Sequence, residues 1–377
     1  MDFEFSDEQE QLRDAVRRWV DKDFGFERRH ALAKAGGKTR AVLGELNELG
    51  LCGLAVPETH GGMGFGAVEA MVVMEELGRG LVNAPYAQAA LVAPTLLSYA
   101  PAALQQAWLP KIAAGEALMV LAQQERASRY RLNQVAVRAA EAGGTWKLGG
   151  TKIVVPAGDE ADAFVVSARV TGAEHDAAGV ALFVVDKGAA GLKLRGYATQ
   201  DGARAADLVL ADTPATLLTR DGLPALEHAA DVAIAALCAE AVGLMDRMVA
   251  VTVDYMHQRK QFGVPLATFQ ALRHRIADVK MQLELGRSMS YFASLKLGEP
   301  AEARQRALSQ AKVQLGNSMR FVGQQCTQIH GGIGVTDEYV SSHYFKRMTV
   351  IELSFGDTLH HLGEASARMR DSAGVFA

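Results

Sequence analysis

The chain has 377 residues, of which 49% are hydrophobic and 22% charged, and its formal net charge is −4. This composition is that of an ordinary globular protein, and the length predicts two or three packed units instead of one hydrophobic core. The weak negative charge gives no electrostatic reason to expect binding to nucleic acid or to an anionic membrane.

The N-terminus and the cysteines favour a cytoplasmic protein. The opening residues, MDFEFSDEQEQ, are acidic, unlike a signal or transit peptide. No apolar run reaches the length of a membrane span. Cys52, Cys238 and Cys326 lack the spacing of metal ligands and are expected to be reduced thiols among apolar residues. We therefore predict a cytoplasmic location, with no metal site and no disulfide framework.

A mostly helical domain is predicted over residues 1–118. Ser6 followed by Gln9 has the spacing of a capping box at a helix N-terminus. Further helices are predicted over residues 41–49 and 67–81, with a glycine-rich loop between them.

Residues 119–220 change to short β-branched runs, which predict a small β domain. The glycine pairs Gly143-Gly144 and Gly149-Gly150 separate three of these runs, as hairpin turns would. Because no helical pattern intervenes, an antiparallel barrel or sandwich is expected. Eight strands are predicted, over residues 117–123, 134–140, 145–148, 152–155, 163–168, 180–185, 192–199 and 207–210.

Residues 221–377 return to helical periodicity and predict a four-helix bundle, which makes the whole chain an α+β protein. Apolar residues on the second helix recur at steps of three and four, as on a buried face. They are Phe269, Leu272, Ile276, Val279 and Leu283. The four helices are predicted over residues 223–257, 266–297, 301–329 and 341–370.

Two short stretches beside these helices have residue types suited to binding. RKQFG, residues 259–263, lies between the first two helices, where an arginine guanidinium can bind a pyrophosphate through paired hydrogen bonds. QIHGGIGVTDEY, residues 328–339, contains a glycine pair that lets another backbone or a cofactor approach closely. A solvated arginine beside a turn and a plain loop remain the alternatives.

The order of these segments resembles the acyl-CoA dehydrogenase family over essentially the whole chain. The resemblance is carried by the following stretches: FSDEQEQLRDAVRRWV, LGELNELGLCGLAVPETHGGMG, MEELGRG, LPKIAAGE, GGTKIVVPAGDEADAFVVSAR and YMHQRKQFGVPLATFQALRHRIADV. It implies FAD as the cofactor, an acyl-CoA thioester as the substrate, an electron-transfer flavoprotein as the acceptor, and at least a dimer. In that chemistry a carboxylate removes the α proton of the thioester while the flavin accepts a hydride from the β carbon.

The resemblance also implies roles for individual residues. The backbone of Gln123, Gln124 and Glu125 matches a strand end that faces the flavin ring. The remaining matches to cofactor-binding positions lie in the bundle, where the family binds FAD held mainly by the neighbouring subunit. These are Arg259 at the pyrophosphate, Phe262 and Gln270 at the adenosine end, and Gln328, Gly331 and Gly332 on the close-approach loop. Thr358 matches a hydroxyl donor on the other stretch of the FAD.

The catalytic base is where the chain departs from this pattern. The family's usual Tyr-Glu-Gly-Thr run corresponds here to residues 355–358, which places Gly356 at the base position, and the family's second base position matches Ala233. Two nearby acids are the candidates for catalysis. Asp357 is adjacent to Gly356, and Glu352 precedes it by four residues, one turn along the same helical face. For both acids a solvated helix charge is the alternative.

The strand expected to face the flavin also departs from the family. Its Trp-Ile-Thr run is replaced by Val154, Val155 and Pro156, which removes a ring, a hydroxyl and a backbone N–H. The loop after Glu125 carries three arginines, Arg126, Arg129 and Arg131. These arginines are suited to an acidic acyl end or to the CoA phosphates, and a solvated loop is the alternative.

Four functional hypotheses remain open from the sequence. The first is an acyl-CoA dehydrogenase subunit without its own base, paired with a larger related chain and acting on a dicarboxylyl- or bulky acyl-CoA. The second is a self-sufficient homotetramer that uses Glu352 or Asp357. The third is a non-catalytic subunit that binds acyl-CoA or FAD within a dimer of dimers. The fourth is a flavin-dependent oxygenase on the same fold.

Overall fold

The computed structural model describes residues 5–370, which form two compact units. The bundle unit contains residues 5–30, 67–82 and 234–370, and the barrel unit contains residues 31–66 and 83–233. Each unit combines segments that are separated along the chain, because the units are defined by which residues pack together. The three domains predicted from the sequence, 1–118, 119–220 and 221–377, remain a prediction about boundaries along the chain.

The barrel unit combines short helices with a seven-stranded sheet that closes on itself. The ring of pairings runs β4–β2–β3–β7–β5–β4, while β1 is added to β4 and β6 to β7. The strands are β1 (Met119–Ala122), β2 (Arg138–Ala142), β3 (Thr145–Pro156), β4 (Ala163–Arg169), β5 (Val180–Asp186), β6 (Leu192–Ala198) and β7 (Arg204–Thr219). The helical segments are α3 (Arg40–Glu48), η1 (Leu51–Gly53), η2 (Glu58–His60), η3 (Ala87–Val92), α5 (Ala93–Leu97) and α6 (Ala102–Ala113).

Two details of the strand prediction were wrong. Residues predicted as two strands, 145–148 and 152–155, form the single strand β3, and Gly149-Gly150 lies inside it at a shift in register against β7. A glycine within a strand often marks such an irregularity. Of the two glycine pairs, Gly143-Gly144 alone makes the predicted hairpin turn, and both of its residues have positive φ. The sheet is also not wholly antiparallel, because β1 pairs with β4 in parallel.

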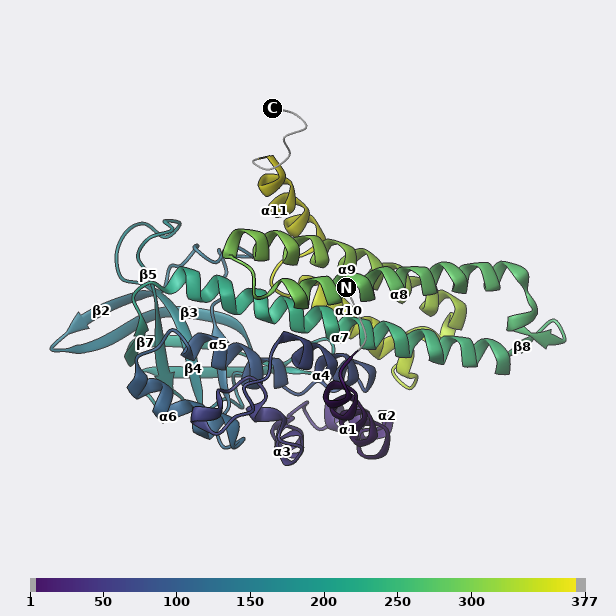
Figure 1. The fold of residues 1–377 in the computed structure, drawn as a ribbon, viewed down its shortest axis with the longest axis horizontal. Coiled ribbons are helices and arrows are strands. Elements are labelled where there is room, and N and C mark those ends of the chain that lie inside the picture. The colour runs from purple at the N-terminus through teal and green to yellow at the C-terminus, as the bar shows by residue number, and fades with distance from the viewer. Residues whose placement is uncertain (1–4, 371–377) are drawn as a thin grey trace. The chain divides into compact units, whose positions relative to one another are not determined.

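The bundle unit is built around long helices that run side by side in Figure 1. Its apolar core is shared by α7, α8, α9 and α10. Its helices are α1 (Asp7–Asp23), α4 (Ala67–Arg79), α8 (Gln270–Lys296), α9 (Ala301–His330), η5 (Gly331–Val335), α10 (Val340–Leu353) and α11 (Thr358–Arg370). Two more helices, α2 (Phe26–Lys34) and α7 (Gly222–Gln258), begin in one unit and end in the other.

Several local predictions about the bundle unit are confirmed. Ser6 and Gln9 form the reciprocal hydrogen bonds of a capping box at the start of α1. Val279 and Leu283, on the predicted apolar face of α8, are fully buried. In the described part of the chain no helix is both long and apolar enough to cross a membrane.

The predicted start of the second bundle helix was four residues too early. The residues directly before α8 instead form the short 3-10 turn η4 (Leu266–Thr268). It follows a hairpin with a two-residue loop between β8 (Lys260–Gln261) and β9 (Val264–Pro265). Phe262 and Gly263 at the tip both have positive φ, the conformation of a type I′ turn. Asn and Gly are the usual residues there, so this hairpin has no clear signal in the sequence.

The predicted last helix, 341–370, was also wrong, because it is two helices. α10 ends at Leu353 and α11 starts at Thr358, with the connection turning at Gly356, whose φ is +114°. A helix cannot continue through this backbone conformation. Glu352 and Gly356 therefore do not share a helical face, contrary to the prediction.

Candidate active site

Gly356, the position that matches the family's base, is buried and conformationally restricted. Its φ of +114° is one that residues with a side chain rarely adopt. A Cβ atom added there would lie 2.5 Å from Nε2 of His361 and 2.5 Å from Cδ2 of His360. The space into which a side chain at position 356 would project is therefore occupied by the two histidines.

His361 is held firmly in that space. Its side chain is 4% exposed, its Nε2 donates to the carbonyl of Phe355 at 3.0 Å, and its Nδ1 lies 3.3 Å from Oγ of Ser309. Burial, together with the nearby Lys312 and His360, lowers the pKa of His361 to about 3. The imidazole is therefore neutral at physiological pH, and it is a weak base.

Lys312 closes the other side of the same turn. Its ammonium donates to the carbonyl oxygens of Ile351, Glu352 and Gly356 at 2.7, 3.0 and 3.0 Å. All three donors are thereby used, and the end of α10 is tied to Gly356. Burial lowers the pKa of Lys312 to about 8. A lysine at the end of a helix stabilises its unpaired carbonyl groups, and we infer that this contact fixes the turn.

Glu352, the first candidate base, is used to begin the next helix. Its Oε1 accepts from the backbone N–H and the hydroxyl of Thr358, at 3.2 and 2.9 Å, and lies 3.3 Å from Nη2 of Arg320. The carboxylate is thus held by one cation and two neutral donors. The Thr358 hydroxyl therefore donates its hydrogen to Glu352 of this chain. The resemblance had assigned that hydroxyl to FAD.

Asp357, the second candidate base, is the residue directly before α11. Its Oδ1 accepts from the backbone N–H of His360 at 2.8 Å, which is the hydrogen bond of a helix N-cap. Ala233, at the family's second base position, is 2% exposed and has no ionisable group. Both acids near Gly356 are therefore engaged in hydrogen bonds at the start of α11.

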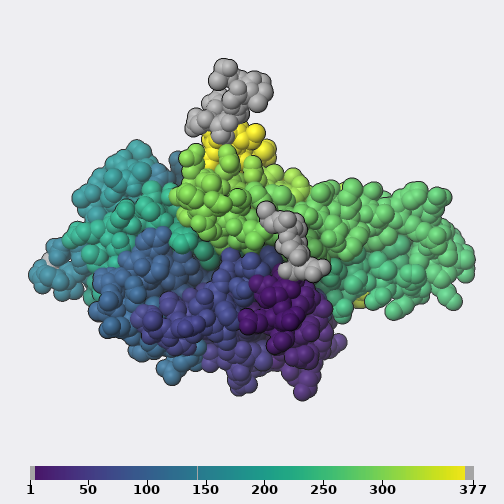
Figure 2. Space-filling view, in the orientation of Figure 1, coloured from purple at the N-terminus to yellow at the C-terminus, as the bar shows by residue number. Residues whose placement is uncertain are grey.

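Six of the seven residues expected to bind FAD from the bundle gather at one of its ends, whereas Thr358 lies beside Gly316, midway along α9. Arg259, Phe262 and Gln270 are exposed around the β8–β9 hairpin, and the phenyl side chain of Phe262 is 93% exposed. The loop with Gln328 belongs to the same end, because the hydroxyl of Tyr255 donates to the carbonyl of His330 at 3.3 Å. The space-filling view shows this end of the bundle, coloured green, at its right margin (Figure 2).

Open space lies around the glycine pair at this end. Gly331 has a φ of +64°, and within the described residues no atom lies within 4 Å of a Cβ added to Gly331 or Gly332. His330 is buried between the rings of Tyr255 and Tyr339, and its Nδ1 bonds the carbonyl of Cys326. The loop can therefore bring its backbone against a ligand or another chain without obstruction from side chains.

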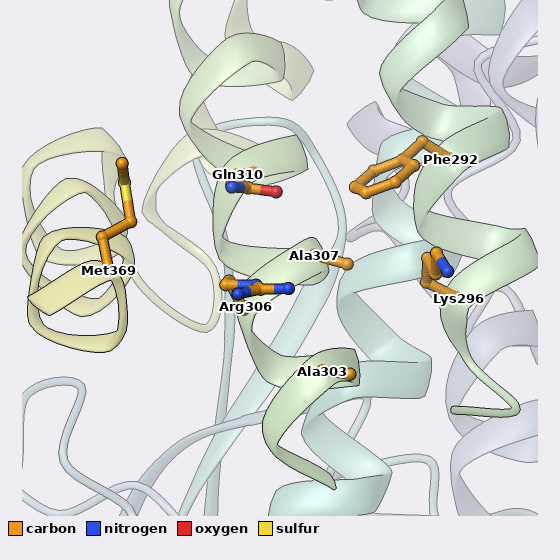
Figure 3. Close-up of a pocket in the computed structure, with 7 residues that line it drawn as sticks. All are labelled: Phe292, Lys296, Ala303, Arg306, Ala307, Gln310 and Met369. Atoms are coloured by element: carbon orange, nitrogen blue, oxygen red, sulfur yellow. The ribbon is translucent and has the colours of Figure 1, made fainter. Parts of the chain in front are cut away.

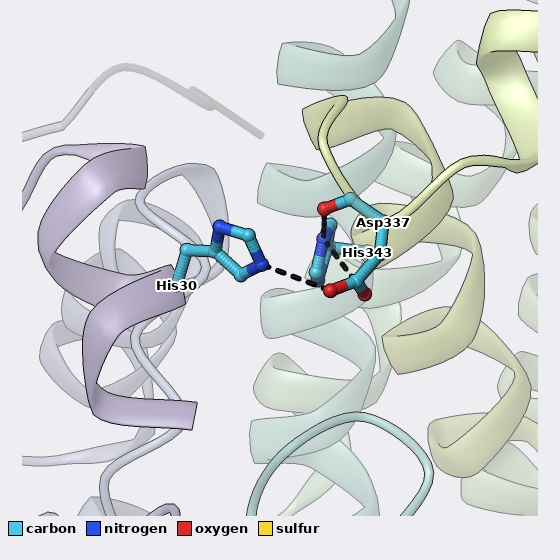
Figure 4. A group of neighbouring side chains, drawn as sticks. All are labelled: His30, Asp337 and His343. Atoms are coloured by element: carbon cyan, nitrogen blue, oxygen red, sulfur yellow. Dashed lines mark hydrogen bonds and ion pairs between the residues drawn. The ribbon is translucent and has the colours of Figure 1, made fainter. Parts of the chain in front are cut away.

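Three further residues on this loop side form the cluster shown in Figure 4. His30, Asp337 and His343 offer ligand atoms that lie within 4.8 Å of one another. However, Nε2 of His343 bonds the carbonyl of Asp337 at 2.8 Å, and its Nδ1 is bonded by Arg29. Lys346 also reaches the Asp337 carboxylate, at 3.3 Å. Lys346 beside the carboxylate and Arg29 beside the His343 ring make this an ion-pair cluster and a poor environment for a metal cation.

The strand-end segment of the barrel unit is fixed mainly through its backbone. The carbonyl of Gln123 accepts from the ammonium of Lys152 at 3.1 Å, and that of Gln124 accepts from the N–H of Ile153 at 2.8 Å. Glu125 is buried, and its carboxylate binds Lys152 at 2.6 Å. Within the described residues the side-chain oxygen of Gln123 is buried without a hydrogen-bond partner. This segment therefore contains one buried acceptor that the described residues leave without a hydrogen bond.

The next turn of the barrel unit is strained. Val154, in place of the family's Trp, has a φ of +51° and is 42% exposed, which is unusual for a β-branched residue. Its N–H donates to Oδ1 of Asp207 at 3.2 Å, and the hydroxyl of Tyr197 donates to the same oxygen at 2.9 Å. Backbone strain of this kind is concentrated at functional sites.

A cavity of about 270 Å³ lies elsewhere in the bundle unit (Figure 3). Residues of α8 and α9, together with Met369 of α11, line it: Phe292, Lys296, Ala303, Arg306, Ala307, Gln310 and Met369. None of the residues that the sequence singled out is among them.

His361 and Lys312, the two residues that surround Gly356 in the structure, were not singled out from the sequence. Lys312 falls four residues after Leu308 and four before Gly316, in a stripe that is buried. A charged residue within an apolar stripe was the available signal. For His361 there was none, because its contact with position 356 depends on the break between α10 and α11.

Comparison with known proteins identifies the family. The N-terminal, middle and C-terminal domains of acyl-CoA dehydrogenases match residues 6–116, 119–212 and 220–369. The chain therefore belongs to the acyl-CoA dehydrogenase family, whose members are oxidoreductases that act on CH–CH donors. The predicted α+β architecture of helical, β and helical regions is confirmed.

Individual relatives span nearly the full chain. Acryloyl-CoA reductase (NADH) of Anaerotignum propionicum is 26% identical over 96% of this chain and 94% of its own length. The long-chain specific acyl-CoA dehydrogenase of Sus scrofa is 28% identical over 89% of this chain and 80% of its own. Among solved structures, the Tcur3481-Tcur3483 steroid ACAD G363A variant is 28% identical, with a TM-score of 0.87, and covers 97% of this chain and 99% of its own.

FAD is the cofactor of this family, and the bundle end fits a dinucleotide. The exposed guanidinium of Arg259 is suited to a pyrophosphate, and the open glycine pair to a close approach of its backbone. In the barrel unit the fit is weaker, because Pro156 has no N–H and Val154 replaces an aromatic ring.

Proposed function

We propose that this chain is a subunit of an FAD-dependent acyl-CoA dehydrogenase in which a related, larger chain supplies the catalytic base. The observation that carries the proposal is Gly356, whose positive φ and contact with His361 disfavour any side chain at the base position. The two neighbouring acids support it, since Glu352 binds Arg320 and Thr358 while Asp357 caps α11.

In this proposal the chain contributes mainly to the binding of FAD at a shared interface. When bound, FAD accepts a hydride from the β carbon of the acyl group. Arg259 would bind the pyrophosphate, Phe262 and Gln270 would pack at the adenosine end, and Gln328 would lie beside the glycine pair. The exposure of Phe262, 93% in the single chain, is expected for a ring that becomes covered by a cofactor and a partner chain.

The proposed substrate is a dicarboxylyl-CoA thioester. Four stretches of the chain resemble the small subunit of pimeloyl-CoA dehydrogenase: AQQERASRY, GYATQDGARAA, AIAALCAEAVG and FKRMTVIELSFGDTLHHL. One similar solved structure, 26% identical with a TM-score of 0.90, is described as an electron-transferring flavoprotein of Acidaminococcus fermentans. We propose a flavoprotein of that kind as the electron acceptor, and a dimer of dimers as the assembly.

The test is to produce the chain together with its larger partner and to substitute each neighbouring acid. Glu352→Gln and Asp357→Asn should leave turnover of the assembly within a few-fold of the unsubstituted assembly, because neither acid removes the α proton. Loss of turnover by a thousandfold or more in either variant, with FAD still bound, would show that this chain has its own base. That result would support the self-sufficient enzyme instead.

A further inference from the structure

The loop that follows β1, residues 123–135, is fixed at both ends by buried charged groups. At its start the Glu125 carboxylate accepts from Lys152 at 2.6 Å and from the backbone N–H groups of Ala136 and Val137 at 2.7 and 3.2 Å. Lys152 is 0% exposed, and Ser167 accepts its remaining proton at 2.9 Å. Because a buried pair of this kind is stable only when fully hydrogen-bonded, the start of the loop is held in one position.

The end of the loop is held by Arg169, whose side chain is also 0% exposed. Its guanidinium donates to the carbonyl oxygens of Asn133 and Val135 at 2.7 and 3.2 Å. It also binds carbonyl groups of the neighbouring loop, including Asp176 at 3.0 Å. One buried guanidinium thus orders the backbone on both sides.

Between these anchors the loop turns tightly at Ser128. The Ser128 hydroxyl donates to the carbonyl of Glu125 and accepts from its N–H, each at 2.9 Å. Arg129, the next residue, has a φ of +47°, and its guanidinium lies 5.2 Å from the ring centre of Tyr130. The turn is therefore rigid before any ligand binds.

This rigid turn presents three exposed arginines, Arg126, Arg129 and Arg131. Two acidic residues that contact the anchors of this loop also hold other groups of the barrel unit. Glu125 binds Lys152, and Asp176 accepts the backbone N–H of Ala173 at 2.8 Å. The loop therefore carries a concentrated positive charge on a chain whose net charge is −4.

The arginine loop also adjoins the strained turn of the barrel unit. The N–H of Ile153, the residue before the exposed and strained Val154, donates to the carbonyl of Gln124 at 2.8 Å. Strain and preordered charge at the same place indicate a binding surface.

We propose that residues 125–131 form a preordered anion-binding loop that uses Arg126, Arg129 and Arg131 to bind an acidic group of the acyl-CoA. The inference rests on the proposed function, and it assigns these arginines to substrate selection. The shared chemistry is an oxyanion that accepts from guanidinium groups, and it has two sources. One is a phosphate of the CoA, and the other is a carboxylate at the far end of the acyl chain.

The experiment measures dissociation constants by titration calorimetry, on the assembly with its partner chain. The variant is Arg126→Ala/Arg131→Ala, and the matched control is Arg220→Ala, an exposed arginine of the same unit with a side chain 63% exposed. The ligands are pimeloyl-CoA, heptanoyl-CoA, the dephospho form of each, and the pantetheine thioesters. We expect the double variant to bind pimeloyl-CoA at least tenfold more weakly and Arg220→Ala to bind it as the unsubstituted assembly does.

The ligand series identifies the source of the anion. If the loop binds a carboxylate, the weakening will be confined to pimeloyl thioesters and will persist in their pantetheine forms. If it binds a phosphate of CoA, both acyl chains will be affected and the pantetheine forms will not. Arg126→Lys/Arg131→Lys should recover part of the affinity, because lysine restores the charge without the paired geometry.

Two results would overturn the inference, and they differ. Unchanged binding of every thioester by the double variant would refute the anion loop and leave the proposed function intact. An unsubstituted assembly that binds no acyl-CoA would refute both. Because both substituted side chains are exposed, the melting temperature of the double variant should equal that of the unsubstituted chain, which excludes unfolding as the cause.

Discussion

Substitution of Gly356 by alanine tests whether the base position of this chain is closed. The new Cβ would lie 2.5 Å from Nε2 of His361 and from Cδ2 of His360, and the residue would hold a φ of +114°. His361 cannot move away cheaply, because it is 4% exposed and bonded to Phe355 and Ser309. Gly363→Ala is the control, since Gly363 lies in α11 like His361 and its added Cβ meets no described atom within 4 Å.

The expected magnitude follows from two costs. Holding an alanine in an unfavourable backbone region costs about 1–3 kcal/mol, and overpacking a filled site costs about 1–3 kcal/mol. Gly356→Ala should therefore destabilise the bundle unit by roughly 2–6 kcal/mol, whereas Gly363→Ala in a helix should stabilise it by about 0.5–1 kcal/mol.

Hydrogen exchange of the bundle unit measures both effects locally, which suits a protein of more than one unit. In Gly356→Ala the amides of residues 358–365 should exchange at least tenfold faster than in the unsubstituted chain, and in Gly363→Ala they should not. Adding His361→Ala to Gly356→Ala should relieve the clash and leave only the backbone strain. Equal protection in Gly356→Ala and the unsubstituted chain would refute the closed base position.

Three further predictions follow from the same contacts. The pKa of His361 is lowered to about 3, so the unfolded chain takes up a proton that the folded chain does not, and stability falls as the pH drops from about 6.5 towards 3. His361→Gln should flatten this fall in melting temperature against pH, and an unchanged slope would contradict the burial argument. Asp357→Ala should lower the stability of α11 by about 1 kcal/mol, while Asp357→Asn keeps the cap, and equal losses in both would argue against the capping role. Lys152→Met leaves the Glu125 carboxylate buried without its cation and should cost about 3–5 kcal/mol in denaturant unfolding of the barrel unit, which an unchanged midpoint would disprove.

The architecture could be predicted because it depends on periodicity along the chain. Val279 and Leu283 mark the buried face of α8, and the Ser6–Gln9 pair marks the start of α1. Both patterns are local, so they do not require knowledge of the tertiary structure.

The surroundings of Gly356 could not be predicted, because they depend on contacts between separate helices. The periodicity of residues 341–370 gives no sign of the break between α10 and α11. The break depends on Lys312 of α9, whose ammonium donates hydrogen bonds to carbonyl oxygens at the end of α10 and at Gly356. The assignment of Glu352 to the helical face of Gly356 failed for this reason. The hairpin at Phe262 was missed because Phe is rare in a turn that needs positive φ.

The absorbance spectrum of the chain, purified alone and then with its larger partner, tests the central claim most directly. Each preparation is titrated with pimeloyl-CoA under anaerobic conditions, and the flavin band near its visible maximum is followed. We predict that the chain alone is colourless or keeps its flavin band unchanged, while the flavin of the assembly is bleached. Bleaching by the single chain, lost on Glu352→Gln or Asp357→Asn, would contradict the claim, because this chain would then contain its own base.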